Sequence, residues 1–229
     1  AERGKGVASS HGTHVSGIIH ALAPDAELRG YAVFSGDQSN RALRENPEQP
    51  IIDAIHRAVK DGNQVINMSF HSGLGPSPDA LGRVVEEYAS RGVIFLVAAG
   101  NERNKYGGVN SPSSALSAIT VGSLDSAGRM SDFTSFGGGL DPRKLITVVK
   151  DVFMAPGSNI VSTLPSPPHA PDYGALSGTS MATPAMSGVV SLLVEDMGRM
   201  TLVPNPIEAA QRLKAALAQG STPMALAKL

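Results

Sequence analysis

Short apolar runs alternate along this chain with stretches of helical periodicity. Strands that alternate with helices are typical of a parallel sheet covered on both faces. The pattern therefore predicts an α/β fold in three layers, with a mostly parallel central sheet flanked by helices. The runs with the length and β-branched content of strands are 27–34, 64–70, 93–99, 118–123, 146–149 and 159–163. Helices are predicted at 12–21, 51–60, 78–90, 179–197 and 207–218.

The organisation of the chain indicates one domain over residues 1–229, with a flexible tail at 220–229. No internal repeat or low-complexity tract divides it. The stretches rich in Gly, Pro and Ser at 71–78, 103–114, 135–142 and 165–174 are predicted to be loops. The chain opens on polar residues without an initiator Met, so we expect a processed product or a fragment.

The amino-acid composition argues against two classes of partner, nucleic acids and membranes. Apolar residues make up 41% of the chain, charged residues 17%, and the formal net charge is −1. These values argue against disorder and against an electrostatic binder of nucleic acid. The longest apolar runs, such as 93–99, are too short to span a bilayer. With no Cys, the chain has neither disulfides nor thiolate metal sites. We therefore expect neither nucleic acid nor a membrane as partner.

Ser180 is the candidate nucleophile, because it lies where an apolar strand turns into a helix of small residues. Gly178 allows a tight turn, and either Thr179 or Ser177 can cap the helix. The exposed amides of the first helical turn would point toward an anion beside the hydroxyl. A serine needs such a pocket and a nearby base to act as a nucleophile. Taken alone, a capping serine would be the simpler interpretation.

His11 is the candidate base, at the start of a helix that Ser9 or Ser10 can cap. The helix dipole there disfavours the imidazolium, so the base would benefit from a carboxylate partner. His14, one turn later, is predicted to be buried and structural. The His-x-x-His spacing could indicate a metal pair, but no acidic or Cys partner stands near it.

Asn101 is the candidate oxyanion donor. It follows the buried strand at 93–99 and Gly100, a position from which its amide can project into a site. An isolated Gly-Asn pair is more often a turn, so this assignment depends on the neighbouring motifs. All three segments lie where strands end or helices begin, which is the edge where such sheets bind ligands.

Taken together, these motifs resemble those of the subtilases, the subtilisin-like serine proteases. The resemblance extends to Val65–Ser69, Ile119–Gly122 and Ala155–Gly157, in the family's order. It implies that Ser180 is the nucleophile and His11 the base. It also implies that Asn101 and the Ser180 amide form the oxyanion hole. The residues that would bind substrate by the same resemblance are Ser69, Phe70 and His71 for the extended peptide, and Ala98, Ala99 and Gly100 for the residue before the scissile bond.

The triad acid of the family has no counterpart in this chain. It should precede the base on a central strand, whereas the first Asp here is Asp25 and the sole upstream carboxylate is Glu2. We therefore expect the strand that bears the acid to be absent from this chain. Either a preceding segment carries it, or another chain supplies it, or the lineage has lost it. In subtilisin, loss of the acid alone costs about 3 × 10⁴-fold in kcat, so this chain by itself should have little activity.

Two other functions compete with a serine endopeptidase that acts on proteins or peptides through an acyl-enzyme. One is a catalytically inactive subtilase fold that binds or scaffolds. The other is an α/β-hydrolase esterase, which fits poorly because no His follows Ser180. We expect no required cofactor and assign no metal. Asp125, Asp132 and Asp141 lie in loops that could bind structural Ca²⁺, but they lack an ordered ligand spacing. The resemblance favours an extracellular location.

Overall fold

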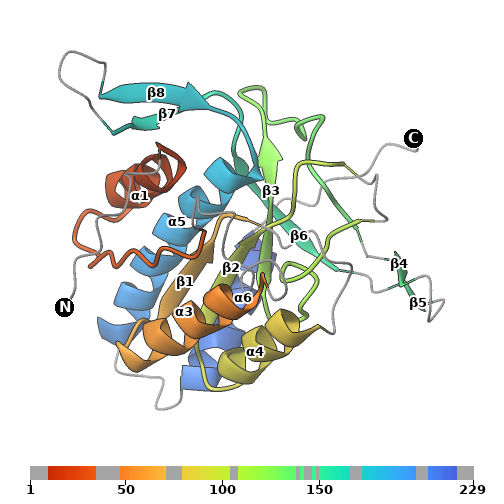
Figure 1. Ribbon diagram of the computed structural model, residues 1–229. Helices are drawn as coiled ribbons and strands as arrows, with labels where there is room; N and C mark the ends of the chain where they lie inside the picture. The colour runs from red at the N-terminus through yellow and green to blue at the C-terminus, as the bar shows by residue number, and fades with distance from the viewer. Residues whose placement is uncertain are drawn as a thin grey trace.

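The computed structural model describes residues 10–34, 47–70, 79–103, 108–137, 140–141, 146–147, 150–165, 172–199 and 206–220. Its centre is a parallel sheet of four strands in the order β1-β2-β3-β6 (Figure 1). Two short antiparallel pairs, β4–β5 and β7–β8, lie outside this sheet. The strands are β1 (Val65–Met68), β2 (Ile94–Ala98), β3 (Ile119–Leu124), β4 (Leu140–Asp141), β5 (Ile146–Thr147), β6 (Val152–Pro156), β7 (Ile160–Thr163) and β8 (Tyr173–Leu176).

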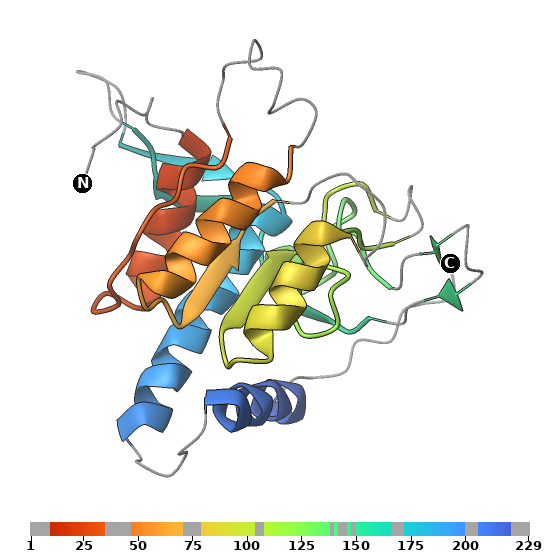
Figure 2. The same ribbon diagram turned by 60° about the horizontal axis from the view of Figure 1, so that its bottom comes forward.

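Helices cover both faces of the sheet, as the sequence pattern predicts. Helices α3 and α4 cover one face, and α5 with α6 covers the other, with α1 packed beside α5 (Figures 1 and 2). Within the described ranges, no helix combines the length and apolar character needed to cross a membrane. The helices are α1 (Ser10–Leu22), α3 (Gln49–Lys60), α4 (Ala80–Ala89), α5 (Thr179–Arg199) and α6 (Pro206–Gly220).

Strand β2 divides the core between the two faces. All five of its residues are buried, and alternate side chains point to opposite layers. Phe95 and Val97 pack with residues of α3 and α4, whereas Ile94 and Leu96 pack with residues of α5 and α6. This explains why the run at 93–99 is continuously apolar. A third cluster joins α1 to α5 and to the β7–β8 pair.

One predicted strand is absent: residues 27–34 form no strand. Their main chain makes no hydrogen bond to another main-chain group of the described residues. The apolar alternation there is real, but a strand requires a partner strand, and β1 is the edge of the sheet. Conversely, β6 and β8 form strands that the sequence pattern did not single out. The tail at 221–229 and the loop at 71–78 lie outside the described residues.

Candidate active site

Ser180 lies in the first turn of α5, after β8 and the turn that holds Gly178. Its hydroxyl donates to the main-chain carbonyl of Ser69 at 2.9 Å. Ser69 follows β1, so the hydroxyl is at the carboxyl end of the central sheet. The first amides of a helix lack partners within the helix and carry partial positive charge. An anion that formed beside this hydroxyl would therefore be stabilised.

Asn101 follows β2 and contacts the same turn. Its Oδ1 accepts from the Thr179 main-chain N–H at 2.9 Å and from the Thr179 hydroxyl at 3.0 Å. A Cβ at Gly178 would lie 3.3 Å from Nδ2, so the glycine leaves room for the amide. Because both bonds hold the oxygen end of the carboxamide, its NH₂ end is available to donate to a ligand.

Thr179 has a larger role than the helix cap expected from the sequence. Its side chain is buried, and its hydroxyl accepts from the Gly100 N–H at 3.2 Å while it donates to Asn101. The hydroxyl therefore ties the end of β2 to the start of α5. The sequence carried one signal for this role: Thr179, directly before the nucleophile, is β-branched. Its side chain is therefore stiff at χ1 and can hold its hydroxyl in one direction.

Helix α1 brings His11 toward the same end of the sheet. The side chains of Val15 and Met181 belong to one cluster near the start of α1 and α5. A Cβ at Gly188 would meet Leu22 near the end of α1, so the two helices run in the same direction. His11 precedes Val15 by four residues and therefore shares the helix face turned toward α5.

His11 is not hydrogen-bonded to the nucleophile in this structure. In the described part of the chain, no hydrogen bond joins its imidazole to Ser180, whose hydroxyl donates to Ser69 instead. The side chain is reached by solvent, yet the surrounding chain removes part of its hydration. This burial, together with the nearby His14, lowers the pKa of His11 below its usual value. The neutral imidazole, which is the form that accepts a proton, is thereby favoured.

His14 is buried and structural, as the sequence analysis expects. It is 0% exposed, and its Nε2 lies 3.0 Å from the carbonyl oxygens of both Ile160 and Gly174. These carbonyls belong to β7 and β8, so the imidazole fastens α1 to that pair. Its Nδ1 is buried without a hydrogen-bond partner in the described part of the chain.

The residues expected to bind substrate lie at the same carboxyl edge, where they are described. Ser69 and Phe70 follow β1, and Ala98 and Ala99 are buried at the end of β2. Gly100 has φ +109°, and a Cβ there would lie 2.9 Å from Glu102 Oε2 and 3.1 Å from Ser135 Oγ. A side chain would therefore strain this turn. His71 lies outside the described residues.

Asp125 and Asp132 belong to no cation site in the parts that the structure describes, and the side chain of Asp141 lies outside them. No group of three or more His, Asp or Glu residues there could hold a metal ion. The Asp125 carboxylate instead accepts from the main-chain N–H of Ala127 and of Arg129, and from the Arg129 guanidinium. These contacts lower its pKa and close a surface turn. Asp132 and Asp141 are on other segments.

Comparison with known proteins agrees with this arrangement. A model of the subtilase family, Peptidase_S8, matches residues 2–222. Subtilisin of Bacillus pumilus is 37% identical over 191 residues, which cover 81% of this chain and 63% of that protein. Subtilisin E of Bacillus subtilis (strain 168) is 36% identical over 197 residues, covering 81% and 46%. The chain thus spans less than two thirds of the length of these relatives.

Solved structures show the same fold. The S218A mutant of the protease domain of PatA superposes with a TM-score of 0.69 at 29% identity, covering 98% of this chain and 77% of that one. A cold-adapted subtilisin-like serine proteinase gives a TM-score of 0.65 at 28% identity, covering 88% and 65%. With a parallel sheet whose carboxyl edge gathers the start of α5, Asn101 and the start of α1, this chain belongs to the subtilase family of serine proteases.

Proposed function

We propose that this chain carries the nucleophile, the base and the oxyanion hole of a serine endopeptidase. The observation that supports this most is the carboxamide of Asn101, held by Thr179 directly beside the turn of Ser180. A side chain that only capped a turn would not need two hydrogen bonds to its amide oxygen. The NH₂ group left over, with the Ser180 amide, provides the two donors that a tetrahedral oxyanion requires.

The reaction would begin when the Ser180 hydroxyl passes its proton to the His11 imidazole and attacks the carbonyl carbon of the peptide bond. The oxyanion that forms would be held by Asn101 Nδ2 and the Ser180 N–H. Collapse of this intermediate would break the C–N bond as His11 returns the proton to the leaving amine. Water, deprotonated by His11, would then hydrolyse the acyl-enzyme. To begin, the hydroxyl must exchange the Ser69 carbonyl for the imidazole as its acceptor.

The acid partner of His11 is not found among the described residues. No carboxylate among the described residues contributes to the pKa of His11. Asp25 lies beyond the far end of α1, a helix of 13 residues and so about 20 Å long. We infer that the acid comes from a segment other than those described, and that full turnover depends on it.

A fluorophosphonate probe tests the assignment, because it reacts with a serine that has a base and an oxyanion hole. We expect the probe to label Ser180 in a form of the protein that also contains the acid, and to leave Ser180→Ala unlabelled. The form that contains the acid should cleave substrate peptides, whereas the Ser180→Ala variant should only bind them. Peptide binding without labelling of Ser180 would favour the alternative of an inactive binding module.

A further inference from the structure

Asn67 is a polar side chain in the otherwise apolar strand β1. Its neighbours Ile66 and Met68 belong to the core that α3 and α4 cover. Alternation along the strand turns Asn67 to the opposite face, toward α5, where it is partly buried. Asparagine is depleted in strands, and a carboxamide that leaves water needs partners for both of its ends. A residue that breaks the pattern of its strand in this way is a candidate for a functional role.

Both ends of the Asn67 carboxamide are hydrogen-bonded. Its Nδ2 donates to the Ser69 hydroxyl oxygen at 3.0 Å, and its Oδ1 accepts from the Ser187 hydroxyl at 3.0 Å. Ser187 belongs to α5, and its hydroxyl also donates to the Thr183 carbonyl at 2.9 Å. The carboxamide thus connects the residue that follows β1 to the middle of α5.

Ser69 is joined to α5 a second time, through the nucleophile. Its main-chain carbonyl accepts from the Ser180 hydroxyl at 2.9 Å. Ser180 and Ser187 are about two helical turns apart and lie on the same face of α5. A closed loop of contacts therefore runs from the nucleophile to Ser69, then to Asn67, and through Ser187 back to the same helix. This loop determines where the start of α5 lies along β1.

The loop also holds Ser69 itself in place. Ser69 is 6% exposed, so little water competes for its hydroxyl. Its carbonyl is the acceptor of the Ser180 hydroxyl, and its main chain with that of Phe70 is expected to receive the extended substrate. One side chain, Asn67, is therefore bonded to the residue on which both the nucleophile and the substrate depend.

Stability alone does not require asparagine at this position. Leucine has the same branched shape, and it would extend the apolar core without needing a partner. Replacing a bonded polar pair by apolar groups of similar shape is often close to neutral for stability. The bonds of the carboxamide to Ser69 and Ser187 are thus better explained by the position that they give to Ser69.

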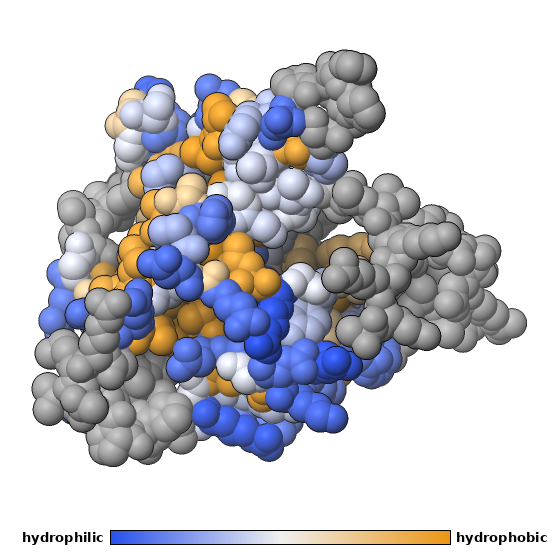
Figure 3. Space-filling view, turned by 90° about the vertical axis from the view of Figure 1, so that its left-hand side faces the viewer, coloured by the Kyte–Doolittle hydropathy of each residue, from blue (hydrophilic) through white to orange (hydrophobic). Residues whose placement is uncertain are grey.

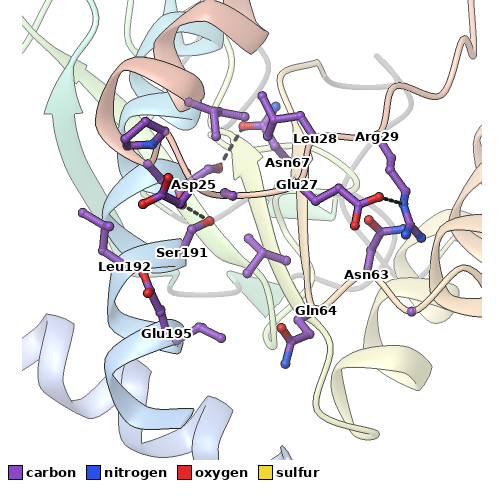
Figure 4. Close-up of a pocket in the computed structure, with 18 residues that line it drawn as sticks. Asp25, Glu27, Leu28, Arg29, Asn63, Gln64, Asn67, Ser191, Leu192 and Glu195 are labelled. Atoms are coloured by element: carbon purple, nitrogen blue, oxygen red, sulfur yellow. Dashed lines mark hydrogen bonds and ion pairs between the residues drawn. The ribbon is translucent and has the colours of Figure 1, made fainter. Parts of the chain in front are cut away.

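Ser191 offers a control in the same surroundings. Asn67, Ser187 and Ser191 all line a groove of about 580 Å³ beside β1 (Figure 4). The space-filling view of this face shows apolar side chains emerging between polar ones (Figure 3). The Ser191 hydroxyl donates to the Ser187 carbonyl at 2.9 Å, within the helix. A change at Ser191 therefore alters the groove and leaves the bonds of the carboxamide intact.

We propose that Asn67 is a positioning residue for the nucleophile: by holding Ser69, it fixes the acceptor of the Ser180 hydroxyl and the main chain that receives the substrate. It acts on Ser180 through Ser69 and takes no part in proton transfer. This role rests on the proposed function, because it presupposes that Ser180 is the nucleophile.

The test is the rate at which a fluorophosphonate probe labels Ser180 in a form of the protein that contains the acid. In Asn67→Leu we expect the maximal rate to fall about tenfold, because a displaced hydroxyl seldom reaches the geometry of attack. The probe concentration that gives half of this rate should stay the same. Ser191→Ala should be labelled at the rate of the parent protein.

Thermal unfolding of the same variants separates positioning from a purely structural role. A side chain that only stabilised the fold would lower the melting temperature. It would leave the maximal rate unchanged at a temperature where circular dichroism shows every variant to be folded. An unchanged maximal rate in Asn67→Leu would therefore overturn the positioning role and leave the proposed function standing. A parent protein whose Ser180 is not labelled would overturn both.

Ser69→Ala tests the route by which Asn67 acts, and it replaces Asn67→Leu if that variant does not fold. It removes the hydroxyl that Nδ2 contacts and keeps the carbonyl that Ser180 contacts. We expect a similar fall in the maximal rate, and the two losses should not add in the double variant, since both break one contact. Full additivity, or an unchanged rate in Ser69→Ala, would overturn the proposal.

Discussion

Asn101 has both ends of its carboxamide in use if the proposed function holds: one end is fixed by Thr179, and the other is directed at the substrate. Asn101→Asp keeps the oxygen that accepts from Thr179 and removes the donor. We expect kcat to fall by about 10²- to 10³-fold with little change in stability, as is typical when one oxyanion donor is lost. The measurement is peptide hydrolysis by the protein in a form that contains the acid. Unchanged kcat would remove Asn101 from the oxyanion hole.

His14 gives a second prediction for a single residue. His14→Ala removes the imidazole between two carbonyls and leaves a cavity, so we expect the free energy of unfolding to fall by about 2–3 kcal/mol. His20→Ala, on the exposed side of the same helix, should change it by less than about 0.5 kcal/mol. Urea denaturation measures both. Equal effects would show that His14 does not fasten α1 to β7 and β8.

For single residues, the sequence indicated which side chains could be catalytic, but it could not predict the distances between them. The types and order of His11, Asn101 and Ser180 pointed to a protease, and the structure places all three toward one edge. The bond from Ser180 to Ser69 could not be predicted, because a hydroxyl selects its acceptor only after the chain has folded. The catalytic roles themselves stay predictions.

Between elements, the contact of α1 with β7 depends on a glycine. A Cβ at Gly17 would lie 2.2 Å from Thr163 Oγ1 and 2.4 Å from Ser162 Oγ, and these hydroxyls donate to carbonyls of α1. Gly17→Ala should therefore destabilise the protein, although alanine favours helices by about 1 kcal/mol. Gly220→Ala, at the open end of α6, meets nothing and should not destabilise. Thermal unfolding distinguishes the two variants, and a more stable Gly17→Ala would contradict the close packing.

Lys150 anchors the segment before β3 and provides a prediction on pH. It is 8% exposed, and its ammonium donates to the carbonyls of Ala115, Leu116 and Ala118. Burial and the nearby Lys214 lower its pKa to about 7, against the opposing influence of Glu86 and Asp151.

Between pH 7 and 10.5 the unfolded chain therefore binds more protons at Lys150 than the folded chain does. Stability should rise with pH across this window, by at most about 1.4 kcal/mol per pH unit. The comparison is between the parent protein and Lys150→Met in urea at pH 6 to 9. The difference in unfolding free energy should shift in favour of the parent as the pH rises above 7. A constant difference would show that the lysine stays charged.

Among the elements, long segments with clear periodicity were predicted well and short ones poorly. The five helices and the strands β1, β2, β3 and β7 lie within a few residues of their predicted bounds. Strand β8 has no apolar alternation to reveal it, and β4 has only two residues. The two-residue β5 lies within the strand predicted at 146–149, of which the structure describes residues 146–147. Segment 27–34 has the alternation of a strand, but pairing depends on a neighbour that its own residues cannot supply.

For the molecule as a whole, the three-layer α/β architecture is confirmed, because alternation of strands and helices determines which faces must be covered. The sequence could not predict how helices that are far apart in the chain pack against each other. The parallel packing of α1 on α5 arises from small residues such as Gly188, whose contacts become visible only in three dimensions. The interpretation of residues 1–229 as one domain stays a prediction.

The free edge of β1 also bears on how the purified polypeptide behaves when it is concentrated. Unsatisfied edges recruit the edges of neighbouring molecules and can seed ordered aggregates. The carboxylate of Asp25 near this edge repels that of a neighbouring copy, whereas Glu27 is paired with Arg29 at 2.8 Å, and added salt screens the repulsion. Solubility of the chain should therefore decline with ionic strength, a handling property that arises from the sheet and not from net charge.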